Sequence, residues 1–419
     1  MELYIKNCKQ YFEGKIVTTD IHLTEGSFCQ ATSFEKDIPI IPGENLLLAP
    51  SFCDLHVHLR EPGFSYKETI ESGTKAAARG GFTTICSMPN LDPVPDSIEA
   101  ISLQLELIRK NAVIEVKPYA AITKNEMGLQ LSDILELSSY CCGYSDDGKG
   151  VQSNKMMLDA MKTIATTGRM LCAHVEDNSL LIPGGVVHQG IAAIKYSLIG
   201  MPSETEYMQL RRDLELVKQT GLRYHLCHIS TKESVELIRK AKREGLDVTS
   251  EVTPHHFAFS DKDIYEDSGR FKMNPPLRAE EDRLAILEGI ADGTIDIIAT
   301  DHAPHSIDEK SLGLSNSAFG TVGLETAFAA ANTFLVKEKI ISLARMMSML
   351  SDRPRSILKD QTAEGYVLLD TQCEHIVDTN DFISMGCSTP FEGLKLAGKV
   401  LLTVMNGKTI YQDGGFFGE

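Results

Sequence analysis

Short apolar runs that end abruptly in polar residues recur from residue 45 onward. Eight such runs occur, at Leu46–Leu59, Gly81–Asn90, Ile114–Thr123, Cys142–Asp147, Met170–Asp177, Arg223–Thr231, Asp247–His256 and Ile295–His305. The stretches between them have helical spacing and several begin with cap-forming or acidic residues. They predict helices at Lys67–Arg79, Asp96–Arg109, Asn154–Thr166, Glu204–Thr220, Lys232–Glu244 and Glu280–Ala291.

Continuous apolar strands that alternate with helices indicate a parallel sheet covered on its outer face, because each crossover helix packs on the sheet. Eight such units are the number that closes a (β/α)8, TIM-like barrel. The alternative is an open doubly wound sheet. No glycine-rich phosphate loop supports that alternative in this sequence. We therefore predict a barrel.

The two ends of the chain follow a different, strand-like pattern. Short β-type segments occur at Leu3–Cys8, Lys15–Thr18, Asp20–Thr24, Ser27–Cys29, Gly365–Leu369, His375–Val377, Leu396–Met405 and Lys408–Gln412. Asn406-Gly407 is a strong hairpin signal. Neither end has enough strands to be stable alone. We expect both to form one small β-domain, with parts at 1–48 and 361–419 and the barrel at 49–360.

Composition and charge narrow the function classes. The chain has 419 residues, of which 42% are hydrophobic and 24% charged, so a large core is expected. The net charge of −17, with no offsetting basic run, argues against nucleic acid and anionic membranes as partners. The N-terminus lacks a signal-peptide pattern and no stretch is apolar enough for a membrane helix. The ten cysteines lie mostly in apolar runs, which is typical of buried thiols in a cytoplasmic protein.

Histidines and aspartates follow the predicted barrel strands, where a parallel barrel carries its catalytic groups. These residues are His56 and His58, Asp146-Asp147, His174, His228, and Asp301, His302 and His305. Residues two apart on a strand point to the same side, so His56 and His58 can reach one ion. Converging imidazoles are poorly explained without a cation. The pattern therefore predicts a metal site.

The donor set favours zinc. Nitrogen and carboxylate ligands without thiolates suit Zn²⁺, with Mn²⁺, Fe²⁺ and Co²⁺ open by the same geometry. A hydrolytic site also needs a base that takes a proton from the activated water. Asp301 follows the apolar run of residues 295–299 and is the candidate for that base.

Motifs along the whole chain resemble those of the bacterial class I dihydroorotases of the amidohydrolase superfamily. They are DLHVHLREPG at 54–63, SMPN at 87–90, DDG at 146–148, AHVED at 173–177, CHIST at 227–231, TPHH at 253–256, MNPPLR at 273–278 and ATDHAPH at 299–305. The resemblance implies a (β/α)8 barrel with a small β-domain. It also implies the reversible cyclisation of N-carbamoyl-L-aspartate to L-dihydroorotate in pyrimidine biosynthesis.

The resemblance assigns roles to the metal residues. His56 and His58 match the ligands of one metal and His174 and His228 those of the other, so one or two Zn²⁺ ions are expected per subunit. Asp301 matches the catalytic acid and base that also touches metal. An aspartate after strand four is expected to bridge the ions; Asp147 fits the spacing to His174 better, and Asp146 is the alternative. The expected chemistry is attack by a metal-activated hydroxide.

The substrate contacts also come from the resemblance. The residues that match are His58, Arg60, Asn90, Asn274, His305, Phe319 and Gly320. Arg60 can grip a carboxylate through a bidentate fork that a lysine cannot reproduce. Asn274 precedes two prolines, so a simple turn is its alternative role. The polar segment 306–318 has a length suited to a lid.

Two rival functions stay open at the level of sequence. An allantoinase or hydantoinase shares the barrel and the metal histidines, but its substrate lacks the ring carboxylate that Arg60 would bind. A non-catalytic dihydroorotase-like subunit is expected to lack metal ligands, and here all are present. We expect a homodimer, possible association with aspartate transcarbamoylase, and surface positions for His22, His188 and His375. His225 is expected outside the metal cluster, and His255 and His256 near it or in the core.

Overall fold

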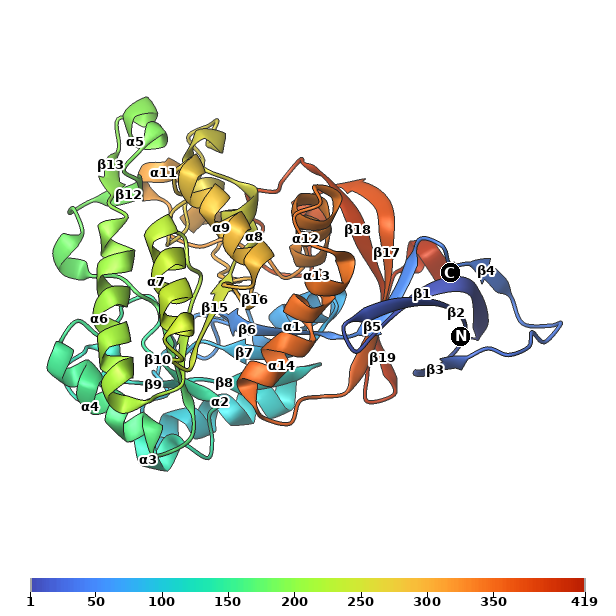
Figure 1. The fold of residues 1–419 in the computed structure, drawn as a ribbon, viewed down its shortest axis with the longest axis horizontal. Helices are drawn as coiled ribbons and strands as arrows, with labels where there is room; N and C mark the ends of the chain where they lie inside the picture. Colours follow the sequence, from blue (N-terminus) through green and yellow to red (C-terminus); the bar gives the residue numbers. More distant parts are fainter. Residues whose placement is uncertain (1, 418–419) are drawn as a thin grey trace.

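The computed structural model describes residues 2–417 and shows a barrel with a second β-sheet beside it (Figure 1). The barrel strands are β6 (Phe52–Val57), β7 (Phe82–Ser87), β8 (Glu115–Pro118), β10 (Gly143–Ser145), β11 (Met170–Ala173), β14 (Tyr224–Leu226), β15 (Val248–Val252) and β16 (Ile297–Ile298). Each of the eight apolar runs contains one of them, and all their pairings are parallel. The predicted barrel is confirmed.

The third strand and a single bridge complete the ring. β8 pairs with β7, whereas β9 (Ala120–Ala121), just along the same run, pairs with β10. The third strand of the barrel therefore consists of two short segments, β8 and β9, and each pairs with a different neighbouring strand. A parallel bridge between Val57 and His302 joins the first strand to the segment after β16. The carboxyl ends of all eight strands thus face one common space.

All six predicted helices form. They are α1 (Ile70–Arg79), α2 (Ile98–Asn111), α4 (Asn154–Ala165), α6 (Glu204–Thr220), α7 (Lys232–Arg243) and α9 (Glu280–Asp292). Capping residues set several of their starts, because the side chains of Thr69, Ser97, Ser153 and Thr231 accept from backbone N–H groups of the first turn. The apolar sides of these helices pack on the barrel and form its main core.

Shorter helical segments complete the chain. They are α3 (Ile134–Leu137), α5 (Ile191–Tyr196), α8 (Pro254–Ala258), α10 (Ile307–Lys310), α11 (Gly313–Asn316), α12 (Ala327–Ala331), α13 (Leu343–Leu350), α14 (Asp352–Leu358) and α15 (Gly414–Phe417). The single 3-10 turns are η1 (Lys124–Glu126), η2 (Asn178–Leu180), η3 (Asp261–Asp263), η4 (Gly269–Phe271) and η6 (Thr379–Asp381), and η5 (Asn332–Lys337) is a π-helical segment that follows α12.

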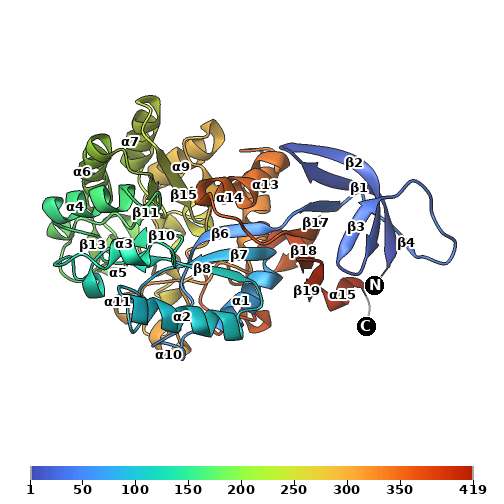
Figure 2. The same ribbon diagram turned by 90° about the horizontal axis from the view of Figure 1, so that it is seen from below.

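Both ends of the chain contribute to the second sheet, whose order is β19-β18-β17-β5-β1-β2-β3, with β4 beside β1. Its strands are β1 (Leu3–Phe12), β2 (Lys15–Thr24), β3 (Ser27–Gln30), β4 (Ile40–Pro42), β5 (Leu46–Pro50), β17 (Gly365–Ile376), β18 (Lys395–Met405) and β19 (Lys408–Gln412). Both termini lie on this side of the molecule (Figures 1 and 2). The sheet has its own apolar cluster, as expected for a small β-domain built from both ends.

Some predicted boundaries were wrong. The run Leu46–Leu59 is two strands, because β5 pairs with β17 in the terminal sheet while β6 enters the barrel. Conversely, the separate pieces predicted in 15–24 and in 365–377 each belong to one long strand, β2 or β17. A polar residue does not end either strand, because one face of an antiparallel sheet can be exposed to solvent and accept that side chain. The hairpin at Asn406-Gly407 is confirmed, with φ of 50° and 74°.

An arm between β11 and α6 was not predicted. It contains β12 (Gly185–His188), α5 and β13 (Ile199–Met201), and its two strands pair in parallel. His188 is buried here with 8% exposure, which corrects the expected surface position. His22 and His375 are partly exposed. Within residues 2–417, no helix combines the length and apolar character that crossing a membrane requires.

Candidate metal centre

The strand ends bring the predicted ligands into two adjacent clusters. One consists of His56, His58 and Asp301, and the other of Asp147, His174 and His228. In each cluster the candidate ligand atoms lie within 4.8 Å of one another. All six side chains are buried, so each cluster is shielded from bulk water.

Asp147 lies between the two clusters. Its carboxylate oxygens are 3.5 Å from His56 Nε2, 3.4 Å from His58 Nε2, and 3.7 Å from both His174 Nδ1 and His228 Nε2. The neighbouring Asp146 turns away, since its Oδ1 accepts from the backbone N–H groups of Ile122 (2.7 Å) and Thr123 (3.1 Å). The geometry therefore gives Asp147, and not Asp146, access to both clusters.

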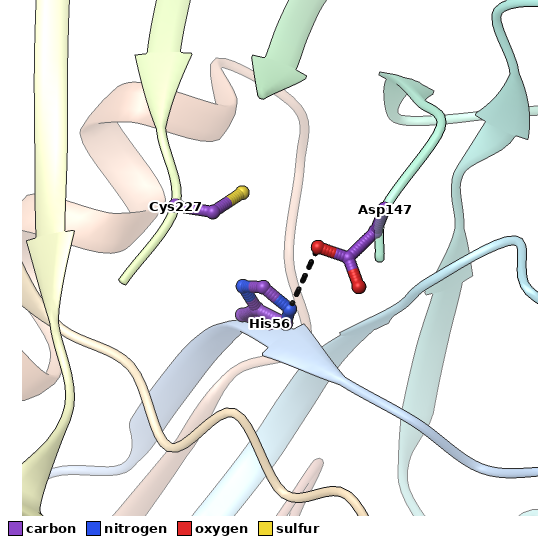
Figure 3. Close-up of side chains that lie close together, drawn as sticks. All are labelled: His56, Asp147 and Cys227. Carbon is purple, nitrogen blue, oxygen red and sulfur yellow. Dashed lines mark ion pairs between the residues drawn. The ribbon is translucent and has the colours of Figure 1, made fainter. Parts of the chain in front are cut away.

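A thiol also approaches this space. Figure 3 shows Cys227 just after β14, His56 on β6 and Asp147 across from them, and these three form a further potential ligand group. Burial raises the pKa of the Cys227 thiol far above its ordinary value. In the metal-free protein this thiol is therefore neutral, unlike the ionised carboxylate of Asp147 beside it. Cys227 fits the role of a small buried apolar residue, as the sequence predicted.

The carboxylates and histidines of the two clusters shift one another's pKa values toward the charged forms. Burial alone would raise the pKa of Asp147 and of Asp301, but the surrounding histidines, with His56 foremost, hold both well below their ordinary range. Burial would likewise lower the pKa of His56, yet Glu251 and Asp147 raise it well above its ordinary value. The site is thus a set of ionised carboxylates that stabilises positive charge.

Several polar atoms in this space point to a bound cation. His56 Nε2, Asp147 Oδ1 and His228 Nδ1 are buried and have no hydrogen-bond partner among the described residues. Buried polar atoms are nearly always satisfied, since leaving one without a partner costs free energy. A cation held between His56 Nε2 and Asp147 would satisfy both atoms. The residues present therefore fit a divalent metal.

Backbone strain is concentrated at the same strand ends. Arg60, His228 and Asp301 have φ of 62°, 28° and 47°, in the region that non-glycine residues rarely adopt. Such conformations cost about 1–3 kcal/mol each and persist where the surroundings impose them, typically at functional sites. At these residues the backbone departs from the extended conformation of a strand, and the side chains therefore point into the space at the strand ends.

Neighbouring side chains hold the ligand rings in place. His58 Nδ1 donates to Asn90 Oδ1 at 2.9 Å, which leaves His58 Nε2 facing Asp301 and Asp147. Asn274 donates through Nδ2 to Glu176 at 3.2 Å, and Glu176 lies 3.4 Å from His174 Nε2. Asn90 therefore orients His58 directly and Asn274 acts on His174 through Glu176, while their predicted substrate contacts stay predictions.

Sequence reasoning missed Glu251 and Glu176. Glu251 lies on β15, is fully buried, and its Oε1 is 2.5 Å from His56 Nδ1. Despite burial, His56 and His225 lower its pKa to about 2, so the carboxylate is ionised. An acidic residue near the carboxyl end of a predicted barrel strand, here VTSEV, was the signal that could have identified it. Glu176 stands two residues after His174, where the same logic applied.

Four further histidines, His302, His225, His255 and His256, lie outside the two clusters. His302 points away from the clusters, since its Nε2 is 3.4 Å from Glu68 Oε2. His225 lies outside both clusters and contacts Glu251, and His255 and His256 are buried. These three outcomes agree with the expectations for His225, His255 and His256.

Arg60 and His305 meet at the mouth of the site. Arg60 is 8% exposed, its Nε donates to the Pro304 carbonyl at 3.1 Å, and its Nη2 donates to His305 Nε2 at 3.3 Å. Burial and the nearby Arg60 charge lower the pKa of His305 to about 3, so the ring is neutral and can accept. A buried guanidinium without a carboxylate partner among residues 2–417 is a receptive site for an anion.

Gly320 and Phe319 lie beside His305 at the mouth of the site. A Cβ on Gly320 would lie 2.6 Å from the Ala303 oxygen and 3.1 Å from the His305 ring, and its φ is 137°, so glycine is required there. Its N–H donates to the Lys272 carbonyl at 3.0 Å. The Phe319 ring is 36% exposed and lies 4.6 Å from Lys272 Nζ.

The segment 306–318 carries α10 and α11, and two buried lysines, Lys310 and Lys272, tie it to the rest of the protein. Lys310 Nζ donates to the carbonyls of Lys272 (3.0 Å), Ala318 (2.8 Å) and Gly320 (2.7 Å). Lys272 Nζ in turn donates to the Ser315 carbonyl at 2.8 Å. The segment is thus an ordered cover beside His305, and its opening as a lid stays a prediction.

Comparisons with known proteins agree with this geometry. The Dihydro-orotase-like family model matches residues 45–234. A dihydroorotase of Fusobacterium nucleatum subsp. nucleatum is 45% identical and aligns over 98% of this chain and 99% of its own. One from Anoxybacillus flavithermus is 43% identical over 96% of each chain. Among solved structures, an L-hydantoinase (dihydropyrimidinase) from Arthrobacter aurescens superposes with a TM-score of 0.85 over 98% of this chain and 96% of its own, at 22% identity.

The barrel and the histidine and aspartate clusters at its strand ends define an enzyme of the amidohydrolase superfamily, a cyclic amidohydrolase. Within that class the full-length similarity is specific, and the chain belongs to the dihydroorotase family. The hydantoinase structure shares the fold at low sequence identity and supports the architecture alone.

Proposed function

We propose that this protein is a dihydroorotase that interconverts N-carbamoyl-L-aspartate and L-dihydroorotate in pyrimidine biosynthesis. The full-length similarity to proteins named dihydroorotase supports this function. The observation that carries it is the buried Arg60 beside His305, because a guanidinium in that position matches the carboxylate that distinguishes this substrate from neutral cyclic amides.

The proposed cofactor is zinc, with one or two ions per subunit. His56, His58 and Asp301 would hold one ion, His174 and His228 the other, and Asp147 would bridge them. The nitrogen and carboxylate donors and the unpartnered His56 Nε2 and Asp147 Oδ1 support this arrangement. Bound zinc supplies a water whose pKa falls toward about 7 and a Lewis acid for the amide oxygen.

The protein's own residues would carry the remaining steps. Asp301 is ionised and lies 3.1 Å from His58 Nε2, so it can accept a proton during hydrolysis and return it to the leaving ring nitrogen. Arg60, Asn90, Asn274 and His305, with the backbone of Phe319 and Gly320 and the ring of His58, would orient the substrate. In the biosynthetic direction the same groups act in reverse.

The rival activity is that of an allantoinase or hydantoinase, which the shared fold alone would permit. Arg60 argues against it, because those substrates lack the ring carboxylate. A non-catalytic subunit is disfavoured, because each predicted ligand lies in one of the two clusters.

Substrate choice can be tested directly. Purified protein is loaded with zinc, its metal content is measured, and hydrolysis of dihydroorotate, allantoin and hydantoin is followed under one set of conditions. Turnover of dihydroorotate with at least one zinc per chain is expected. Activity on allantoin alone would overturn the assignment.

The remaining proposals concern the whole chain. We keep the division into 1–48, 49–360 and 361–419, noting that β5 crosses the first boundary and that residues 1, 418 and 419 lie outside the described range. A homodimer and an association with aspartate transcarbamoylase are proposals from the resemblance. All ten cysteines carry free thiols, which supports action in the cytoplasm.

A further inference from the structure

Glu251 is the only carboxylate in the described chain that contacts ligands from both candidate metal clusters without belonging to either. Its Oε1 is 2.5 Å from His56 Nδ1 and 3.2 Å from the backbone nitrogen of His228. His56 belongs to the cluster with Asp301, and His228 to the cluster with His174. One oxygen atom therefore touches both halves of the site.

The contact with His56 sets which ring nitrogen carries the proton. A carboxylate can only accept, so His56 Nδ1 must be the donor. In the neutral ring the lone pair is then on Nε2, which is the buried atom that faces Asp147 and Asp301 at 3.5 and 3.4 Å. This is the arrangement in which a carboxylate orients a histidine ligand and makes it more basic.

A second histidine fixes the carboxylate itself. His225 Nε2 donates to Glu251 Oε2 at 3.0 Å, and His225 Nδ1 lies 2.7 Å from the Thr249 hydroxyl. Glu251, His56 and His225 are each no more than 1% exposed. The chain from Thr249 to His56 thus runs inside the barrel, from strands β15 and β14 across to β6, and no step of it requires solvent.

We propose that Glu251, held by His225, is a positioning residue that organises both halves of the metal centre at once. The inference rests on the proposed metal-dependent function, because it concerns the residues that would hold the ions. It goes further in assigning the affinity of both half-sites to one residue of β15 that belongs to neither candidate ligand cluster.

The test compares zinc affinity in four variants, by competition with a chromophoric chelator. Glu251→Gln keeps the shape but replaces one acceptor by a donor, and we expect zinc binding about 10–100-fold weaker. Glu251→Ala should bind still more weakly, since glutamine can keep its oxygen toward His56. His225→Phe should weaken binding, whereas His225→Gln, which retains a donor near the Nε2 position, should restore much of it.

The matched control is Asp213→Asn. Asp213 is also fully buried and accepts from a tyrosine hydroxyl, that of Tyr224, at 2.7 Å, but it lies on α6 away from both clusters. We expect this variant to melt at a lower temperature with unchanged zinc affinity. A merely structural role for Glu251 would give the same result as the control.

Two further measurements separate the inference from the proposed function. The cobalt-loaded Glu251→Gln protein should show altered visible absorption bands, because the ligand geometry changes. At saturating zinc its kcat should fall while its KM for dihydroorotate stays near that of the parent, since Arg60 is untouched. Wild-type zinc affinity in Glu251→Gln would overturn the inference. Loss of the proposed function would appear separately, as zinc-loaded parent protein that does not turn over dihydroorotate.

Discussion

Asp301 is the residue on which the proposed chemistry depends most directly. It is ionised, buried and 3.1 Å from His58 Nε2. Asp301→Asn keeps the shape and an oxygen ligand but cannot take up a proton. We expect kcat to fall about 10²–10⁴-fold, the usual contribution of a positioned acid and base. Steady-state kinetics with zinc analysis checks this, and near-normal turnover with full zinc content would remove Asp301 from the centre.

Asp146 and Asp147 are adjacent but have different surroundings, which makes them a matched pair. Asp147 faces four histidines, whereas Asp146 binds the backbone of residues 122 and 123, and burial raises its pKa to about 6. Asp147→Asn should lose zinc. Asp146→Asn should keep zinc and lose stability, because its backbone contacts weaken. Metal analysis and thermal melting of both variants decide the point, and the reverse pattern would make Asp146 the bridge.

Arg60 determines the substrate in our proposal. Arg60→Met preserves much of the side-chain length but removes every hydrogen-bond donor. A hydrogen bond to a charged group contributes about 1.5–3 kcal/mol, so KM for carbamoyl aspartate should rise about 10–100-fold. Arg60→Lys should recover little, because a lysine cannot form the bidentate fork. An unchanged KM in Arg60→Met would refute the carboxylate clamp.

At the level of elements, the segment carrying α10 and α11 depends on Lys310. This lysine is 8% exposed and donates to three carbonyls, and burial lowers its pKa to about 7. Lys310→Met leaves those carbonyls without their shared donor. We expect faster amide exchange over 306–320 and a several-fold higher KM, since Gly320 lies against His305. Zinc content should not change.

A surface lysine provides the control for this prediction. Lys262→Met removes a lysine that is paired with Glu280 and has an exposed side chain, far from the segment in sequence. It should leave both exchange and KM unchanged. Equal exchange over 306–320 in parent and Lys310→Met protein would show that the lysine does not hold the cover in place.

For the whole molecule, zinc and protons should compete. The pKa values of His56 and His174 are raised above their ordinary 6.5, with nearby carboxylates outweighing the effect of burial. Zinc needs both rings without a proton on the ligand atom, so its apparent affinity should fall about tenfold per released proton for each pH unit of acidification.

The two forms of the protein should therefore respond oppositely to pH. In the metal-free protein, protonated His56 and His174 contribute stability that is complete below pH 6.5 and lost as pH rises through their raised pKa values. The stabilisation by zinc, about 2.7 kcal/mol at a concentration 100 times its Kd, should instead grow with pH. Melting curves with and without zinc between about pH 5.5 and 8.5 measure both trends, and a zinc shift independent of pH would contradict them.

The sequence alone determined the class of fold, the helices and the ligand types. Strands in a parallel barrel are buried on both faces, so their apolar runs were visible, and the side chains after each run could be read in order. Glu204–Thr220 matches α6 at both ends, and His56, His58, His174, His228 and Asp301 meet as expected. Local patterns are enough to predict a helix or strand where the burial of its own side chains determines its conformation.

Only the tertiary structure decided which neighbours share a contact. The split of Leu46–Leu59 into β5 and β6 depends on β17, which lies more than 300 residues away in sequence. The choice between Asp146 and Asp147 depends on the direction in which each side chain leaves a short strand, and the role of Glu251 depends on His56 and His225 from other strands. Such contacts join distant segments, so no local pattern of the sequence records them.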